Sequence, residues 1–394
     1  MAPPDLTIPA GARLVHIGFP KTGTTFLQGA LSRARPELAA HGAVYPGKDR
    51  YHKAAGVYIS RAVPRRGDPP VSEADWLKLV KQVNAAGDDR VIVSSEWLSE
   101  TPIADVRRVV EDLGGERVHV VATLRPLVKI MPSAWQQYLQ NGARLQYHRW
   151  LRGMLLRPPY DRPTPSFWKR HRHDEILARW AEVAGADHVT AIVVDSTDHS
   201  TLLHQFESLL GLPDGLLVPE PPERDNRSLT WPEAEMLRLV NVRYRELEWP
   251  DSMYRTTVRQ GVLRRLAELR PDLDSMPKLE LPMWAAERAS EIGAEFAKNI
   301  ADLGIRVVGD LDSLGAPTSS LAPTSMPPAT LPASIAAEAV VAAIAGGIEA
   351  GQREGQAAAL AAGGGKSAAS SRRSAWLASR LRRALVRVHH AVFR

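Results

Sequence analysis

The chain contains no cysteine among its 394 residues, so a disulfide framework and a cysteine-ligated zinc site are both excluded. Residues 1–6 have neither the basic stretch nor the apolar stretch of a signal peptide. A run of about 18 consecutive apolar residues is also lacking, and we therefore expect no segment that spans a membrane. These absences favour a cytoplasmic protein in a reducing compartment.

Acidic residues are missing from the end of the chain. Residues 366–394 hold eight of the 50 lysines and arginines and no Asp or Glu, which leaves 42 basic and 44 acidic side chains in residues 1–365. The body of the protein is therefore nearly neutral, and its charge gives no indication of a nucleic-acid partner.

The basic end has the pattern of an amphipathic helix. Arginines surround a stripe of apolar residues at helical spacing, namely Leu377, Leu381, Leu385 and Val388. Such a helix binds an anionic membrane surface, which would place the protein peripherally on the inner face of the membrane, or it binds a helix of a partner. The alternative is a basic extension without fixed structure.

Stretches typical of strands and of helices alternate over the first two hundred residues, which predicts an α/β fold with a parallel sheet and helices on both faces. The expected strands are the apolar stretches before Gly18 and at residues 43–45, 90–95, 117–124 and 189–194. The expected helices lie at residues 25–38, 71–83, 103–113, 126 onward and 174–183. Four prolines within residues 150–168 predict a mobile loop near the acceptor.

Composition divides the chain into three segments. Residues 1–314 are expected to form the α/β domain, whose last part, from about residue 231, is mainly helical. Residues 315–365 are rich in Ala, Pro, Ser and Gly, which predicts a partly helical linker. Residues 366–394 are the expected basic helix.

The most informative stretch follows the first strand. A tight turn holds Lys21 and Gly23, and Thr24 and Thr25 then open a helix. The N-terminus of a helix offers unpaired N–H groups and a partial positive charge, so this pattern predicts an anion site. It is not a Walker A loop, because Lys21 lies ahead of the glycine rather than directly after it.

A second candidate anion site follows the strand at residues 117–124. Arg125 comes directly after this strand, where open α/β sheets bind ligands at the carboxyl edge. Ser133 lies about two turns into the next helix. A guanidinium and a hydroxyl at this spacing are able to converge on one phosphate.

Both motifs resemble those of the PAPS-dependent sulfotransferases. Residues 20–25, Pro-Lys-Thr-Gly-Thr-Thr, resemble their 5′-phosphosulfate loop, and Arg125 with Ser133 resembles their 3′-phosphate site. The resemblance implies a P-loop-like α/β fold that transfers a sulfuryl group from PAPS to a hydroxyl or amine of a carbohydrate or small metabolite. It implies that Lys21 stabilises charge on the leaving nucleotide, and that the 5′-phosphate is held by Thr22, Gly23, Thr24 and Thr25.

Two residues are candidates for the base that takes the acceptor proton. Glu96 directly follows the strand at residues 90–95, where the resemblance implies a catalytic Glu or His. His52, after the second strand, is the rival, since other branches of the family place their base there. A capping or salt-bridged role for Glu96 and a solvated position for His52 are the structural alternatives.

A further basic candidate is Arg227. In the cytosolic branches an Arg-Lys-Gly segment closes over the 3′-phosphate, and Arg227 lies at a comparable place without matching that pattern. A helix cap before Trp231 explains the neighbouring residues equally well. We find no cluster of metal ligands in the sequence and expect no metal.

Two other functions are the alternatives to sulfuryl transfer. A nucleotide kinase would need a magnesium site and a lysine after the loop glycine, and the loop has no such lysine. A non-catalytic nucleotide-binding protein, or a membrane-associated scaffold that uses the basic tail, would bind nucleotide without turnover.

Overall fold

A computed structural model of the chain describes residues 6–63, 69–157, 164–194, 200–219, 228–269, 278–317, 321–322 and 330–361. The contacts divide it into two compact units. The first unit comprises Met1–Asn141, Leu145–Glu223 and Lys278–Met326, and the second comprises Gly142–Arg144, Arg224–Pro277 and Pro327–Arg394. This division places residues 224–277 in the second unit, whereas the boundaries at 314 and 365 remain predictions from composition.

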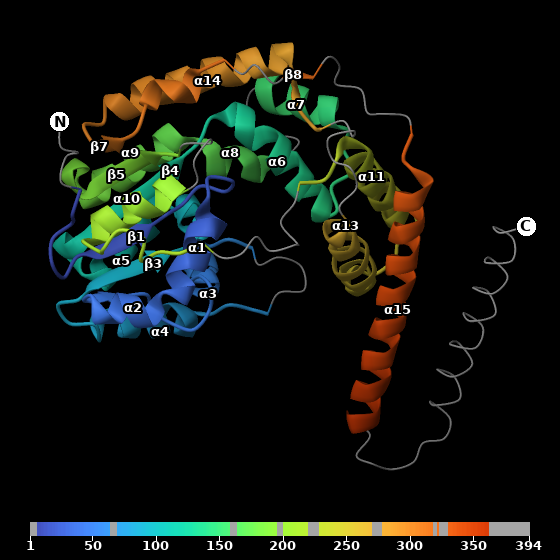
Figure 1. Cartoon of the computed structure of the whole chain (residues 1–394), viewed down its shortest axis with the longest axis horizontal. Helices are drawn as coiled ribbons and strands as arrows, with labels where there is room; N and C mark the ends of the chain where they lie inside the picture. The colour runs from blue at the N-terminus through green and yellow to red at the C-terminus, as the bar shows by residue number, and fades with distance from the viewer. Residues whose placement is uncertain are drawn as a thin grey trace, which may run out of the picture. The chain divides into compact units, whose positions relative to one another are not determined.

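The first unit is built on a parallel sheet (Figure 1). Within the described residues it has six strands, and every neighbouring pair is parallel. Their order is β2 (Ala43–Val44), β3 (Arg90–Ser94), β1 (Arg13–His16), β4 (Val118–Leu124), β5 (Val189–Val193) and β7 (Arg306–Val308). The predicted α/β fold with a parallel sheet is therefore confirmed.

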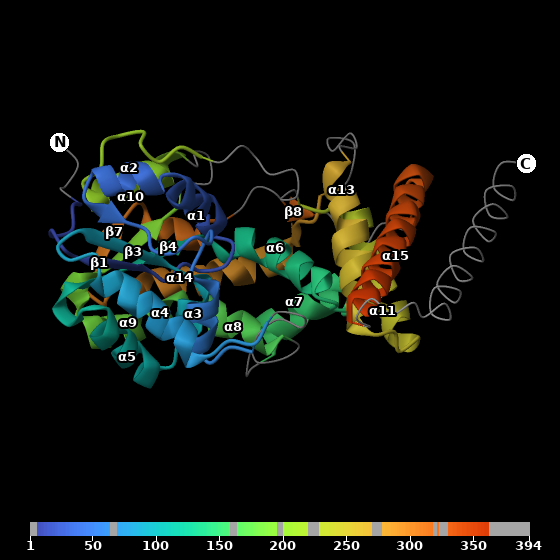
Figure 2. The same cartoon turned by 90° about the horizontal axis from the view of Figure 1, so that it is seen from below.

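Helices cover both faces of this sheet (Figure 2). One face carries α1 (Thr24–Arg33), α2 (Arg35–Ala40) and α10 (Ser200–Leu210). The other face carries α3 (Lys53–Ile59), α4 (Glu73–Asn84), α5 (Ile103–Leu113) and α9 (His173–Ala184). Side chains of alternate strand positions meet α1 and α10 in one buried cluster, among them Leu14, Ile92, Val121 and Ile192. Burial of this apolar face fixes the sheet against the helices.

The first unit contains further elements besides the sheet and the helices named above. They are α6 (Leu127–Gln140), α7 (Tyr147–Leu156), α8 (Pro165–His171), α14 (Met283–Ala301) and a short parallel pair, β6 (Leu281–Pro282) with β8 (Leu321–Ala322). Short 3-10 turns lie between them, of which η1 (Glu96–Glu100) concerns the site.

Two expectations about helices are corrected by the structure. The expected single helix at residues 25–38 is two helices, because Pro36 in the first turn of α2 cannot continue the hydrogen bonds of α1. The expected loop at residues 150–168 is helical at both ends, where α7 and α8 lie. Buried side chains at helical spacing, Trp150, Leu151 and Met154, outweigh the nearby prolines. Residues 158–163 lie outside the described part.

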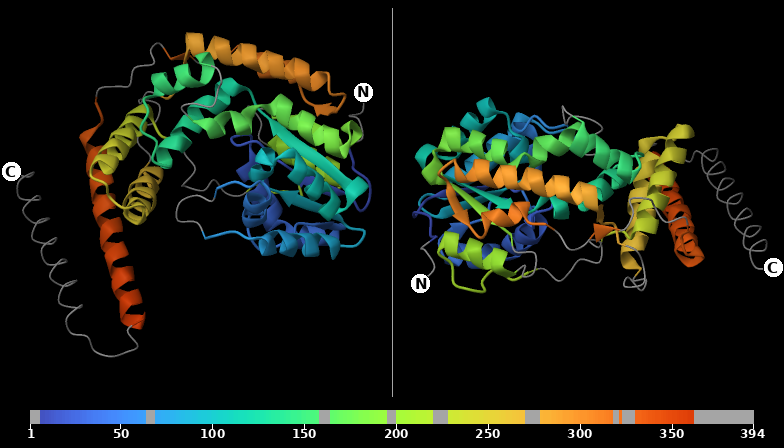
Figure 3. Two further views of the ribbon diagram at one scale, coloured as in Figure 1. Left: turned by 180° about the vertical axis from the view of Figure 1, so that it is seen from behind. Right: turned by 90° about the horizontal axis from the view of Figure 1, so that it is seen from above.

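The second unit is helical among its described residues. It contains α11 (Trp231–Glu246), α12 (Asp251–Tyr254), the π-helical segment η5 (Arg255–Leu263), α13 (Arg264–Glu268) and α15 (Ala333–Ala361). Helix α15 runs alongside η5 and α13 (Figure 3). By length and composition, Ile335–Arg353 of α15 could cross a membrane, although no such segment was expected, and the core helix of a soluble protein has the same length and composition.

The buried cluster between α10 and the sheet predicts a large effect of core truncation. Leu209 of α10 is fully buried, so Leu209→Ala should lower the free energy of unfolding by about 2–5 kcal/mol. Urea denaturation followed by circular dichroism measures the change. The matched control is Leu77→Ala on α4, whose side chain is 51% exposed and should cost much less. Equal losses in the two variants would contradict this packing.

Candidate functional site

The carboxyl ends of three neighbouring strands, β3, β1 and β4, meet at one edge of the sheet. The loop at residues 17–23 follows β1, Glu96 follows β3 and Arg125 follows β4. The chain crosses over β1 between β3 and β4, and open sheets bind ligands at such a crossing. The topology therefore brings the predicted site residues of three separate segments to one edge.

The loop after β1 makes a tight turn with two residues in the left-handed region. Gly23 has φ 88° and Lys21 has φ 71°, a conformation that is uncommon for a residue with a side chain. Gly18 also has no room for a side chain, because an added Cβ would lie 2.8 Å from Thr24 Oγ1 and 2.9 Å from His16 Cε1. The turn thus depends on its glycines and holds Lys21 in a fixed backbone conformation.

The predicted threonines of this loop have different environments. Thr22 and Thr24 are buried, and their hydroxyls donate to the carbonyl oxygen of Phe19 at 2.6 Å and 3.2 Å. Thr25 is exposed. No side chain caps the first turn of α1, so its backbone N–H groups are the donors directed at the loop. An anion here would be held chiefly by backbone amides and Lys21, while Thr22 and Thr24 shape the turn.

Arg125 contacts the loop directly. Its Nη1 donates to the carbonyl oxygen of Lys21 at 3.1 Å, which joins the end of β4 to the turn after β1. Burial lowers the pKa of Arg125 from its usual value, although the guanidinium remains charged at neutral pH. Ser133 is half-buried on α6, and no hydrogen bond joins it to Arg125 within the described residues. The structure therefore brings Arg125 and Lys21 together.

A buried chain of polar side chains, which was not predicted from the sequence, lies beneath the loop. Gln28 donates to Ser94 Oγ at 3.0 Å, and Ser94 Oγ lies 2.8 Å from Nδ1 of His16. On its other side His16 lies 3.4 Å from Thr123 Oγ1, which is 2.7 Å from Thr22 Oγ1. Burial lowers the pKa of His16 to about 3, so the ring is neutral.

The two candidate bases differ in how they are held. Glu96 begins η1, is partly exposed, and its carboxylate has no hydrogen bond or ion pair within the described residues. His52 is fixed by backbone groups, since its Nε2 lies 3.0 Å from Pro46 O and its Nδ1 accepts from the N–H of Ser94 at 3.1 Å. Burial lowers the pKa of His52 to about 4. Of the two candidate bases, only Glu96 has acceptor atoms without a hydrogen-bond partner among the described residues.

Two buried histidines lie at the junction of α8 and α9, and one of them, His173, packs against the loop. The ring of Phe19 lies 4.2 Å from that of His173, measured between centroids. Burial, followed by the charges of His173, Arg170 and Lys21, holds the pKa of His171 well below its usual range. The ring of His173 therefore packs on the loop, and the positive charge of Lys21 contributes to keeping His171 neutral.

Beside η1 lies an open groove of about 970 Å³ within the first unit. Its lining is rich in basic side chains with two tryptophans, Arg61, Trp97, Trp168, Lys169, Arg170 and Arg179. Arg170 is neutralised by Glu100 at 2.6 Å and lies over the ring of Trp97. Lys169 is exposed and has no ion pair within the described chain.

One group of side chains in the described residues has the composition of a metal site, His204, Glu207 and Asp214. Its buried member is already engaged. Glu207 accepts from Nδ1 of His204 and from the N–H groups of Gly215 and Leu217 at 3.0, 3.0 and 2.6 Å. We interpret Glu207 as the acceptor that fixes the turn after α10. Arg227 and the basic tail lie outside the described residues.

The neutral, buried His16 predicts a pH-dependent stability. Unfolding raises its pKa from about 3 toward the ordinary value, so the unfolded state binds more protons and stability falls as the pH drops below about 6.5. Replacement by His16→Asn should reduce the loss of unfolding free energy between pH 7 and pH 5 by about 2 kcal/mol. Urea denaturation at the two pH values measures it. An unchanged pH dependence in the variant would contradict burial of a neutral ring.

The fold is that of a three-layer α/β protein in which a tight turn, holding Lys21 and Gly23, joins the first strand to the first helix. Among solved structures, a sulfotransferase from Alicyclobacillus acidocaldarius is similar, with a TM-score of 0.40 and 17% identity. The similarity covers 63% of this chain and 100% of that one. No protein-family model matches the chain, and no curated protein matches it in sequence.

Proposed function

We propose that the protein transfers a sulfuryl group from PAPS to a hydroxyl or amine of a carbohydrate or small metabolite. The observation that carries the proposal is the hydrogen bond from Arg125 to the carbonyl oxygen of Lys21. It supports a pair of phosphate sites side by side, one at the loop and one at Arg125. A nucleotide phosphorylated at both its 5′ and 3′ positions matches two such sites.

The donor would be held mainly by groups whose positions the fold fixes. The first-turn amides of α1 and the Lys21 ammonium would bind the 5′-phosphate. Arg125 would bind the 3′-phosphate through the N–H groups it does not give to Lys21, with Ser133 on the next helix as a second donor. Thr22 and Thr24 would act indirectly by holding the turn through Phe19.

In the proposed reaction the acceptor oxygen forms a bond to sulfur while the bond from sulfur to the 5′-phosphate oxygen breaks. Glu96 would take the proton of the acceptor hydroxyl, since its carboxylate is unpaired among the described residues. Lys21 would stabilise the negative charge that develops on the departing phosphate oxygen. Positioning and charge stabilisation, rather than a covalent step on the protein, would supply the acceleration.

The acceptor would approach from the side of η1. Glu96 begins this turn, and the adjoining Trp97 lines the groove described above. Trp97 suits packing against a sugar ring, and Lys169, which has no ion pair among the described residues, suits a negatively charged group on that ring. This supports a carbohydrate with acidic groups as the acceptor to test first.

The two phosphate sites predict a preference for the 3′-phosphorylated nucleotide. Isothermal titration should show that 3′-phosphoadenosine-5′-phosphate binds about 10- to 100-fold more tightly than ADP, since a charge-assisted hydrogen bond contributes about 1.5–3 kcal/mol. Arg125→Ala should abolish this preference. The control is Arg107→Ala, an exposed arginine of α5 that pairs with Glu182. Equal affinities for the two nucleotides in the wild-type protein would refute the assignment.

The role of Glu96 predicts a loss of turnover without a loss of binding. Glu96→Gln should lower the release of 3′-phosphoadenosine-5′-phosphate from PAPS, measured with a panel of acidic and neutral oligosaccharides, by about 10²- to 10⁴-fold. Affinity for the nucleotide should be unchanged. Glu111→Gln, on the exposed side of α5, serves as the control. Nucleotide binding with no turnover by any acceptor would favour the non-catalytic alternative instead.

A further inference from the structure

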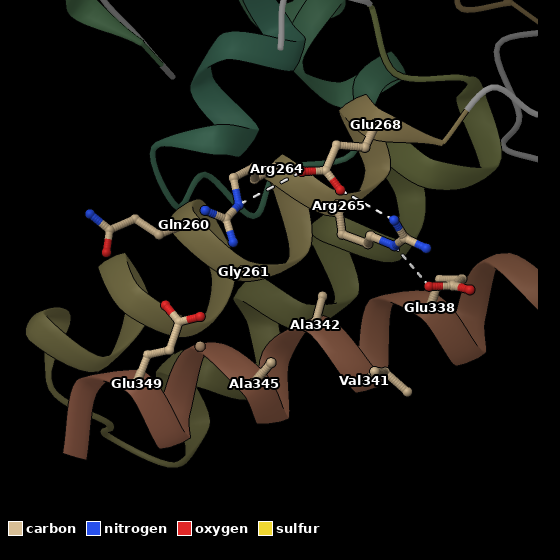
Figure 4. Close-up of a pocket in the computed structure, with 11 residues that line it drawn as sticks. Gln260, Gly261, Arg264, Arg265, Glu268, Glu338, Val341, Ala342, Ala345 and Glu349 are labelled. Atoms are coloured by element: carbon tan, nitrogen blue, oxygen red, sulfur yellow. Dashed lines mark hydrogen bonds and ion pairs between the residues drawn. The ribbon is translucent and has the colours of Figure 1, made fainter. Parts of the chain in front are cut away.

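Helix α15 of the second unit has one covered face. Ala342 and Gly346 pack against η5 so closely that an added Cβ at Gly346 would lie 2.5 Å from the carbonyl oxygen of Thr256, and one at Gly261 would lie 2.6 Å from that of Ala342. Figure 4 shows Ala342 directed toward η5, with an ion pair between Arg265 and Glu338 beside it. The small residues of α15 therefore belong to its contact with η5.

The opposite face of α15 is apolar and uncovered within the described residues. Val340 and Val341 are 59% and 62% exposed, and Ile348 is 41% exposed. On the same side of the helix Ala337 is exposed and Ile344 is half-buried, so the five residues form a row over three turns, and Figure 4 shows Val341 directed away from η5. We call this surface, Ala337, Val340, Val341, Ile344 and Ile348, the α15 stripe. Large apolar side chains in such a row indicate a surface that another apolar face covers.

The chain itself contains a segment of matching pattern. Residues 377–388 lie outside the described part, and their sequence predicts a helix with an apolar row at steps of four, four and three residues. The α15 stripe, read backwards from Ile348 through Ile344 and Val341 to Ala337, has steps of four, three and four. Both rows span about 17 Å at 1.5 Å per residue. An antiparallel pair of helices would therefore place the two rows opposite each other over their whole length.

The connection between them has sufficient reach. Fourteen residues, 362–375, separate the end of α15 from Trp376, and they include Gly363, Gly364 and Gly365. An extended chain of that length reaches about 46 Å, whereas a return to Ile348 needs about 20 Å along the helix and about 10 Å across it. The tether also keeps the segment at an effective concentration in the millimolar range.

We propose that residues 377–388 fold back as a helix and cover the α15 stripe, with Leu381 opposite Ile344. This docking surface leaves the arginines on the outer side, where they form a basic ridge. A second copy of the chain and an anionic lipid surface are the other occupants that an exposed apolar stripe admits. The proposal concerns the second unit alone and does not depend on the reaction proposed above.

The absence of native cysteine allows a direct test, because any disulfide must join the introduced residues. In full-length protein, Ile344→Cys with Leu381→Cys should form an intramolecular disulfide on mild oxidation, roughly tenfold faster than the control pair Ile344→Cys with Ser379→Cys. Ser379 is nearer the tether but falls on the opposite side of the predicted helix. If the tail moved freely, random encounters between the two cysteines would therefore oxidise the control pair at least as fast as the test pair.

The other outcomes overturn the proposal. Equal oxidation of the two pairs would show that the tail does not dock, and a disulfide between two chains on a non-reducing gel would assign the stripe to a second copy. Equal oxidation with flotation of wild-type protein on phosphatidylcholine–phosphatidylglycerol vesicles would assign it to lipid.

If a cysteine variant fails to fold, amide hydrogen exchange decides instead. Exchange at residues 337–348 should be faster in a chain ending at Gly365 than in the full chain, and equal rates would refute the docking.

Discussion

The site depends on the register of three parallel strands more than on any single side chain. Because β1 ends at His16, opposite Val121, β4 extends three residues further and carries Thr123 and Arg125 up to the loop. Thr123 then meets Thr22 from below, and Arg125 meets the carbonyl oxygen of Lys21 from the side. A slip of this pairing by one residue would turn both side chains to the other face of the sheet. The register of the strands therefore determines which side chains contact the loop and stabilise its conformation.

The polar chain beneath the loop adds a second constraint. Hydroxyl, amide and imidazole groups with little or no contact with water are tolerated because each has a partner, and His16 links the partners of β3 and β4. A charged imidazole there would have no carboxylate to compensate it within the described surroundings. Protonation of His16 would therefore destabilise the packing beneath the loop.

The sequence predicted the parallel sheet and the segments that reach its carboxyl edge, because apolar runs followed by Gly18, Glu96 and Arg125 mark strand ends in the sequence itself. It did not predict that Thr22 and Thr24 turn inward, since the direction of a hydroxyl depends on the backbone angles of the turn. Nor did it predict the chain from Gln28 to Thr123, whose members lie far apart in sequence and meet only through strand register. The helices α7 and α8 were missed because prolines between them obscured the buried aromatic spacing.

Lys21 has a left-handed backbone conformation, which costs a residue with a side chain about 1 kcal/mol more than it costs glycine. The position immediately before Thr22 therefore combines a conformation suited to a residue without a side chain and a long cationic side chain. A protein selected for stability alone would be expected to drift toward glycine at this site. At Lys21, therefore, the stability of the fold favours glycine, whereas a positive charge in the turn requires a side chain.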